Sequence, residues 1–280
     1  MSSYLDPYEF KSLIELEDCF SNILFIDKNH SYKMDGKLAN SSPTTLIRKY
    51  QKPFDTMKFA NFVAMRDGFD VKVVLDLWEY KKNYSTLKGS ELHKFVENFF
   101  QRKQTTINRP MLNSFILENF GSINAKEVEN YYKEFALLIK NFYSFYDYWK
   151  EDHIHLKSEF VIGDKITKVC GTIDELCFNK KTKELIVFDW KTNLEIAKKS
   201  KYKEKMLPPF KHLDKCELTT YSLQLHLYCL ILERNTPFFV GTPKIVWLTG
   251  QDDYEIIDCL DLRKEAELIL KESFAEDDYK

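Results

Sequence analysis

Residues 171–193, GTIDELCFNKKTKELIVFDWKTN, carry the clearest structural pattern of the sequence. They contain two apolar runs separated by the turn-forming sequence NKKTK, which predicts two neighbouring antiparallel strands. Each run nevertheless carries charge, because Asp174 lies in the first and Asp189 and Lys191 lie in the second. Charged side chains in apolar surroundings are costly unless they are paired or bind a metal. The stretch therefore predicts a polar site built into a buried sheet.

The spacing of these charges predicts how they share a site. Residues two apart in a strand share a face, so Asp189 and Lys191 point one way and Phe188 and Trp190 the other. Adjacent strands lie about 5 Å apart, so Asp174 can approach Asp189. Two such carboxylates need a shared proton or a divalent cation, and Mg²⁺ or Mn²⁺ prefers oxygen ligands. The lysine could then orient or activate a water and stabilise charge on a phosphate.

The flanking sequence extends this pair of strands into an α/β unit. IHLKSEFVIG (residues 154–163) predicts a strand before the pair, which makes a three-stranded meander. After the pair we expect a helix at ELTTYSLQLHLYCLILERN, strands at PKIVWLTG and YEIIDCL, and a closing amphipathic helix at DLRKEAELILKESF. The expected fold class is α/β, with a central mixed sheet flanked by helices.

The first half of the chain reads as mostly helical. ILFIDKNHSYKMDG predicts a hairpin, and SSPTTLIRKY offers caps for a helix. Residues 55–84 show helical spacing with a break at Gly68, and a helix capped by Ser90 is expected to run to about Arg102. A loop with a short helix (residues 103–124) and a long aromatic helix follow. We expect residues 1–150 to form a helical region carrying His93, integral to one domain with the core at residues 151–280.

Composition and charge limit the function classes. The 280 residues are 44% hydrophobic and 15% aromatic, enough for a sizeable core. The formal net charge of −2 excludes a polybasic nucleic-acid binder, so any affinity for polyanions must be local. The best local cluster is KKSKYKEK, residues 198–205. We expect four lysines of this cluster to contact nucleic acid: Lys198, Lys199, Lys201 and Lys203. The alternative is a solvated lysine-rich loop.

The chain offers no signal for export or for membrane insertion. No apolar run approaches the roughly 18 to 20 residues of a membrane span, and MSSYLDPYEF lacks the pattern of a secretory signal. The six cysteines are scattered without a CxxC pair, which favours reduced thiols over disulfides. We expect a soluble intracellular protein, cytoplasmic or made by a phage or virus in an infected cell, with no membrane partner.

The set G-T-I-D, a turn, and D-W-K-T resembles the PD-(D/E)XK nuclease superfamily, in its RecB-like exonuclease branch, and is similar to mitochondrial genome maintenance and phage exonucleases. The resemblance implies a restriction-endonuclease-like core. It further implies that Asp174 is the first metal-binding aspartate, Asp189 the second acidic ligand and Lys191 the catalytic lysine. The backbone carbonyl of Trp190 would be a further ligand of one or two Mg²⁺ or Mn²⁺ ions.

Two further motifs of that branch are present. A histidine on an upstream helix, in the pattern G-x-x-x-H, matches Gly89 to His93 and would add a metal ligand. A downstream Q-x-x-x-Y matches Gln224 and Tyr228, which share a helix face and could hold the lysine or the substrate backbone. Glu159, on the first core strand, is a possible additional site residue, although an ordinary salt bridge explains it as well.

The resemblance implies a metal-dependent DNA exonuclease, acting on single strands or DNA ends in recombination, repair or replication. DNA, with other replication or recombination proteins, would be its partner. One alternative is an endonuclease on RNA or structured DNA with the same site, and another is a non-catalytic nucleic-acid-binding module. Some relatives hold an iron–sulfur cluster, but the cysteines at 216, 229 and 259 are too dispersed to expect one. No Walker A motif is present, so no helicase motor is expected.

Overall fold

The computed structural model describes residues 7–122, 124–251 and 253–275, and within them the strands form two sheets. The larger, called the central sheet here, has the order β4 (His153–Gly163), β5 (Cys170–Asn179), β6 (Leu185–Lys191), β7 (Lys244–Leu248) and β8 (Tyr254–Asp258). Strands β6 and β7 are parallel, and the other neighbours are antiparallel. The prediction of a meander followed by two strands in a mixed sheet is therefore confirmed.

The strand register places three acidic residues side by side. Ser158 pairs with Glu175 and Phe160 with Ile173, which puts Glu159 opposite Asp174. On the other side, Glu175 pairs with Phe188, and one residue further along the same register Asp174 faces Asp189. The sheet thus aligns one carboxylate from each of β4, β5 and β6 across adjacent strands.

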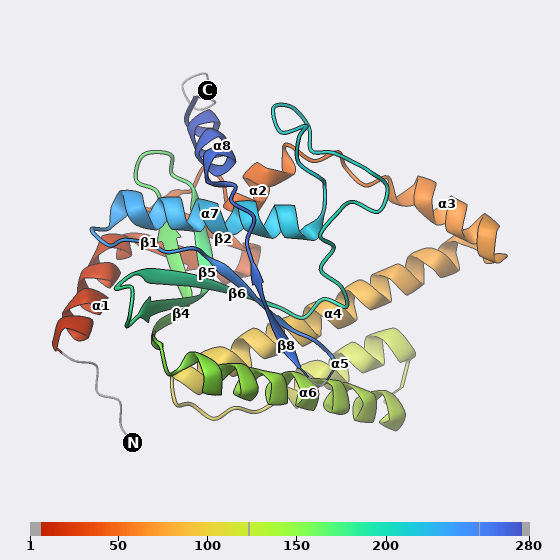
Figure 1. Cartoon of the computed structure of the whole chain (residues 1–280). Helices are drawn as coiled ribbons and strands as arrows, with labels where there is room; N and C mark the ends of the chain where they lie inside the picture. Colours follow the sequence, from red (N-terminus) through yellow and green to blue (C-terminus); the bar gives the residue numbers. More distant parts are fainter. Residues whose placement is uncertain (1–6, 123, 252, 276–280) are drawn as a thin grey trace.

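Helices cover both faces of the central sheet. As Figure 1 shows, α7 (Glu217–Asn235) and α8 (Arg263–Ala275) lie on one side, and α4 (Val71–Phe100) and α6 (Ala125–Trp149) on the other. The α6 side buries Phe188 and Trp190; the Trp190 ring centroid lies 5.7 Å from that of Phe142 and 5.2 Å from that of Phe145. The predicted alternation along β6 is confirmed, since Val187 packs into the core on the α7 side.

Helix α4 differs from its prediction. A separate helix beginning at Ser90 was expected, but α4 runs unbroken from Asp70, whose side chain accepts a hydrogen bond from the Lys72 N–H, to Phe100. Gly89 and Ser90 are therefore helix-interior residues. A glycine inside a helix costs about 1 kcal/mol relative to alanine. Burial of Leu87 and Leu92 on either side outweighs that cost.

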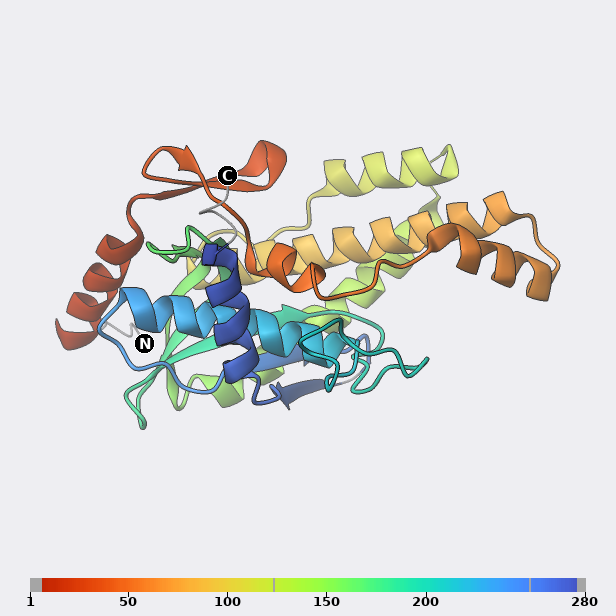
Figure 2. The ribbon, with the colours of Figure 1, turned by 90° about the horizontal axis from the view of Figure 1, so that it is seen from above.

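Each of the remaining long helices packs on a different element. Helix α3 (Thr56–Asp67) ends at Gly68, the predicted break, and the φ of this glycine is 72°, in the left-handed region. Figure 2 shows α3 and the N-terminal part of α4 side by side, projecting from the sheet. Helix α1 (Pro7–Phe20), which was not predicted, packs on β4, and α5 (Arg109–Phe120) packs on α6.

The N-terminal strands form the smaller sheet. Strands β1 (Ile23–Ile26), β2 (Ser31–Met34) and β3 (Lys37–Leu38) follow one another, with the 3₁₀ turn η1 (Asp27–Asn29) between the first two. Helix α2 (Pro43–Arg48) follows the sheet and is capped by Ser42, whose hydroxyl accepts a hydrogen bond from the Thr45 N–H.

All six cysteines are free thiols. Among the described residues, no helix has both the length and the hydropathy to cross a bilayer.

Candidate active site

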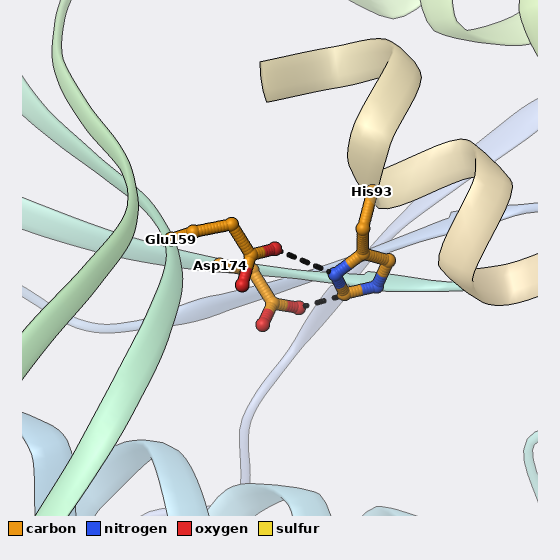
Figure 3. A group of neighbouring side chains, drawn as sticks. All are labelled: His93, Glu159 and Asp174. Carbon is orange, nitrogen blue, oxygen red and sulfur yellow. Dashed lines mark hydrogen bonds and ion pairs between the residues drawn. The ribbon is translucent and has the colours of Figure 1, made fainter. Parts of the chain in front are cut away.

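Three metal-ligating side chains converge between α4 and the central sheet. His93 comes from α4, Glu159 from β4 and Asp174 from β5, and one ligand atom of each lies within 4.8 Å of the others (Figure 3). The Nδ1 atom of His93 is 2.9 Å from Oε1 of Glu159, and its Nε2 atom is 3.7 Å from Oδ2 of Asp174. The structure thus brings together two residues expected as ligands and one named as a possible addition.

Glu159 has an unusual backbone for a strand residue. Its φ is +49°, in the left-handed region that costs a non-glycine residue about 1–2 kcal/mol. Such conformations persist only where the surroundings compensate, and they cluster at functional sites. The neighbouring Ser158 and Phe160 both keep their pairing with β5, so the distortion is confined to the residue that carries the carboxylate.

Next to this group lies the Asp189–Lys191 ion pair on β6. The Lys191 ammonium pairs with Oδ2 of Asp189, whose residue is only 2% exposed. The backbone N–H of Trp190, between them, donates a 3.0 Å hydrogen bond to Oδ2 of Asp174. β6 is therefore tied to the Asp174 carboxylate by its backbone, while Asp189 pairs with the lysine and is not one of the three grouped ligands.

The protonation of the site follows from burial and opposite charge. Burial raises the pKa of Asp189 to about 6, against the lowering effect of Lys191. Burial lowers the pKa of Lys191, but the carboxylates of Asp189 and Asp174 outweigh it and the net shift is upward. For His93, burial also lowers the pKa, but Asp174 and Glu159 raise it to about 9. The carboxylates thus create a strongly cation-attracting environment.

Tyr221 on α7 supports the lysine and was not among the predicted site residues. The Nζ atom of Lys191 lies 4.7 Å from the centroid of the Tyr221 ring. The Asn193 side-chain amide donates to the Tyr221 hydroxyl at 3.0 Å, and the Trp247 indole N–H donates to the Asn193 carbonyl at 2.7 Å. Tyr221 stands three residues before Gln224, one turn along the same helix, so its spacing could have revealed it.

Gln224 and Tyr228 lie on the cleft wall, one turn apart on α7. The Gln224 side-chain amide donates to the Tyr228 hydroxyl at 3.1 Å, and burial raises the pKa of that hydroxyl. Both residues line the cleft together with Asp174, and among the described residues no hydrogen bond or ion pair joins either of them to Lys191. Space for the tyrosine comes from Gly171, because a Cβ there would lie 2.6 Å from Cε1 of Tyr228.

The three grouped ligands, together with Gln224 and Tyr228, open into a cleft of about 660 Å³. Its walls come from α4, from the central sheet, from α7 and from the β1–β2 hairpin. The hairpin residues on the wall were not predicted as site residues, although the hairpin itself was: Phe25, Asp27, His30 and Tyr32. The Tyr32 hydroxyl is hydrogen-bonded to the Thr172 hydroxyl at 2.9 Å, which attaches the hairpin to β5 two residues before Asp174.

The predicted nucleic-acid-binding lysines lie outside the cleft, in the segment that follows β6. Two of them have carboxylate partners: Lys198 Nζ is 3.4 Å from Glu255, and Lys201 Nζ is 2.9 Å from Glu195. Lys199 and Lys203 are exposed and form no ion pair with the residues that the structure describes. The cluster is therefore partly neutralised and does not belong to the ligand group.

The donor chemistry fits a divalent cation of the Mg²⁺ or Mn²⁺ class. Carboxylate oxygens of Glu159 and Asp174 are hard ligands, and an imidazole nitrogen suits the transition metals among them. Their atoms already converge, so little rearrangement of the backbone is required. Asp189 is a further carboxylate near the group, since the charges of Asp174 and His93 both act on it.

Comparisons with known proteins add little to this geometry. No protein-family model matches the chain, and a search of curated proteins also finds no match. Among solved structures, the chain is similar to a protein from Eubacterium rectale described as a "putative exonuclease". The identity is 15% and the TM-score is 0.40, over 69% of this chain. The matched region spans 65% of the length of that protein.

Proposed function

We propose that the protein is a metal-dependent nuclease with a PD-(D/E)XK core, which hydrolyses phosphodiester bonds of DNA. One observation carries the proposal: the grouped ligands His93, Glu159 and Asp174 line one cleft, and a buried lysine–aspartate pair lies directly behind them. The backbone N–H between the two members of that pair donates to Asp174. An ordinary structural salt bridge does not require three further ligand atoms beside it. A metal-dependent nuclease of the proposed kind would use both, the cation to activate water and the ammonium group to stabilise phosphate charge.

In this proposal each residue has a distinct role. His93, Glu159 and Asp174 would hold the cation, with Asp189 as a further ligand or as the partner that fixes Lys191. The bound cation would supply Lewis-acid activation of water and neutralise phosphate charge. Lys191 would donate a hydrogen bond to the attacking water or to a phosphate oxygen.

The substrate is proposed to be DNA with single-stranded character or free ends, so that the enzyme acts as an exonuclease. The chain is overall acidic and the cleft also carries Asp27 and Glu97, so a polyanion would be repelled unless cations neutralise these carboxylates. Binding at the cleft itself is therefore expected to depend on the metal.

The test uses end-labelled linear single-stranded DNA, closed circular single-stranded DNA and RNA, each with Mg²⁺ or Mn²⁺ and with EDTA. We expect cleavage of linear DNA that EDTA abolishes and that Lys191→Ala abolishes. Lys244→Ala is the matched control, because Lys244 is also a strand lysine paired with an aspartate, Asp258, but this pair joins β7 and β8, which carry none of the grouped ligands. Undiminished metal-dependent cleavage by Lys191→Ala would refute the mechanism, and cutting of closed circles would refute an obligate exonuclease.

A further inference from the structure

Three aromatic rings meet outside the cleft, two from the start of α3 and the residues before it and one from the loop that follows β6. Phe54 and Phe59 stack with centroids 4.7 Å apart at 14°, and the Tyr202 centroid is 6.2 Å from that of Phe59. Phe54 remains 57% exposed and Tyr202 74% exposed. Large aromatic side chains usually bury most of their surface, and a group of exposed ones marks an interaction site.

The rings border a cavity of about 340 Å³, between the segment leading into α3 and the loop that follows β6. In Figure 1 this loop, drawn in teal, lies beside the orange segment that leads to α3. Three lysines and three glutamates complete the walls: Lys199, Lys201, Lys215, Glu195, Glu204 and Glu217. Two of these lysines pair with glutamates of the same wall, Lys201 with Glu195 and Lys215 with Glu204, whereas Lys199 forms no ion pair with the described residues. The cavity thus combines ring surface with one ammonium group that is not neutralised.

The loop concentrates positive charge in an otherwise acidic chain. Residues 195–215 contain seven lysines and three acidic residues, whereas the whole chain has a formal net charge of −2. Four of the lysines have carboxylate partners: Lys198, Lys201, Lys205 and Lys215. The other three are exposed and form no ion pair within the described part of the chain: Lys199, Lys203 and Lys211. These ammonium groups remain available to an anionic partner.

We infer that Phe54, Phe59, Tyr202, Lys199 and Lys203 form a binding surface for single-stranded nucleic acid, called the aromatic–lysine surface. Unpaired bases would stack on the exposed rings, and the backbone phosphates would pair with the free ammonium groups. A duplex keeps its base faces inside the helix and could use only the lysines. An apolar protein partner would use the rings but would leave the two ammonium groups without partners.

The aromatic–lysine surface lies close to the candidate active site along the chain. Glu195, on the cavity wall, follows Lys191 by four residues, so at most about 14 Å of chain separates them. A single strand with B-form spacing would cover that distance in about four nucleotides. The aromatic–lysine surface would therefore hold a strand whose end enters the cleft, an interpretation that rests on the proposed nuclease function. The affinity of the aromatic–lysine surface for single strands does not rest on the nuclease function.

The experiment measures binding of the full-length protein to fluorescein-labelled oligothymidylate by anisotropy in EDTA, so that cleavage plays no part. We expect Tyr202→Ala and Phe54→Ala each to weaken binding at least about fivefold. The double substitution Lys199→Ser and Lys203→Ser should flatten the dependence of log affinity on log salt by about 1.4. Tyr148→Ala and Phe239→Ala are matched controls, because both rings are exposed on other elements.

The outcomes separate this inference from the proposed function. Unchanged affinity of Tyr202→Ala and Phe54→Ala would overturn the aromatic–lysine surface, even if the protein cleaves DNA. Equal affinity for a duplex hairpin, or self-association of the wild type that Phe54→Ala abolishes, would also overturn it. Binding that depends on Tyr202, in a protein that cleaves nothing, would support the aromatic–lysine surface and refute only the nuclease.

Discussion

The ammonium group of Lys191 lies 4.7 Å from the centroid of the Tyr221 ring. The lysine is therefore held by an aromatic ring of α7 as well as by its ion pair with Asp189. A cation over an aromatic ring gains about 0.5–2 kcal/mol, with the larger values in desolvated sites. Lys191 is such a case, since its side chain is only 17% exposed. The ring therefore restricts where the ammonium group can point.

Replacing Tyr221 should reduce catalysis without preventing folding. We expect Tyr221→Leu to lower kcat by about tenfold, the loss of roughly 1.4 kcal/mol of positioning, while KM stays nearly constant. Tyr221→Phe keeps the ring and loses only the hydrogen bond from Asn193, so it should retain most of kcat. Steady-state cleavage kinetics measure this. Equal kcat values for the leucine variant and the wild type would contradict the positioning role.

Glu159→Gln should weaken binding of Mn²⁺. The substitution preserves the size of the side chain but removes one of the two grouped carboxylate charges, and we expect a loss of at least about tenfold in affinity. Isothermal titration calorimetry measures it directly. Glu97→Gln is the control, because Glu97 lines the same cleft but pairs with Lys94 at 2.6 Å. If both variants bind Mn²⁺ as the wild type does, Glu159 is not a ligand.

Gly171→Ala should disturb the cleft wall through Tyr228. The added Cβ would lie 2.6 Å from the Tyr228 ring and 3.3 Å from Pro43, so we expect a loss of about 1–3 kcal/mol in the free energy of unfolding. Gly250→Ala is the control, because no atom lies within 4 Å of its added Cβ. Urea denaturation measures both. In a Tyr228→Ala background the cost of Gly171→Ala should shrink, and an undiminished cost would exclude Tyr228 as the cause.

Protonation of His153 should destabilise the fold. Burial lowers the pKa of His153. Its Nδ1 contacts the Trp149 carbonyl at 3.2 Å and its Nε2 faces the Asn179 side-chain amide at 3.1 Å, which suits the neutral ring. The folded protein thus takes up this proton less readily than the unfolded chain. Stability should therefore be unaffected well above the unfolded pKa of about 6.5 and should fall as the pH drops through it.

The measurement for His153 is the free energy of unfolding in urea between about pH 8 and pH 5. His153→Gln should show a shallower decline with falling pH than the wild type, whereas His30→Gln, at an exposed position, should follow the wild type. A decline of the same slope in His153→Gln would show that other groups govern the pH dependence.

Several features of the fold could be predicted from local patterns. The turn NKKTK between two apolar runs predicted the β5–β6 hairpin, and the left-handed Gly68 ended α3 as expected. The period of two in β6 predicted that Trp190 faces away from Asp189. These predictions succeeded because they depend on turn chemistry and strand geometry within a few residues. The boundary at Ser90 failed, since burial of α4 side chains between Leu87 and Val96 outweighed the local preference of Gly89.

Local sequence patterns show which charged residues need partners, because Asp174, Asp189 and Lys191 stand in apolar strands where an unpaired charge is costly. The identity of those partners depends on long-range packing. The register of the strands and the path of α4 bring Glu159 to His93 and Asp174. The same packing pairs Asp189 with Lys191 and places the Tyr221 ring against the lysine ammonium group. Those contacts join residues up to 81 positions apart, from His93 to Asp174, and no local pattern specifies such distances.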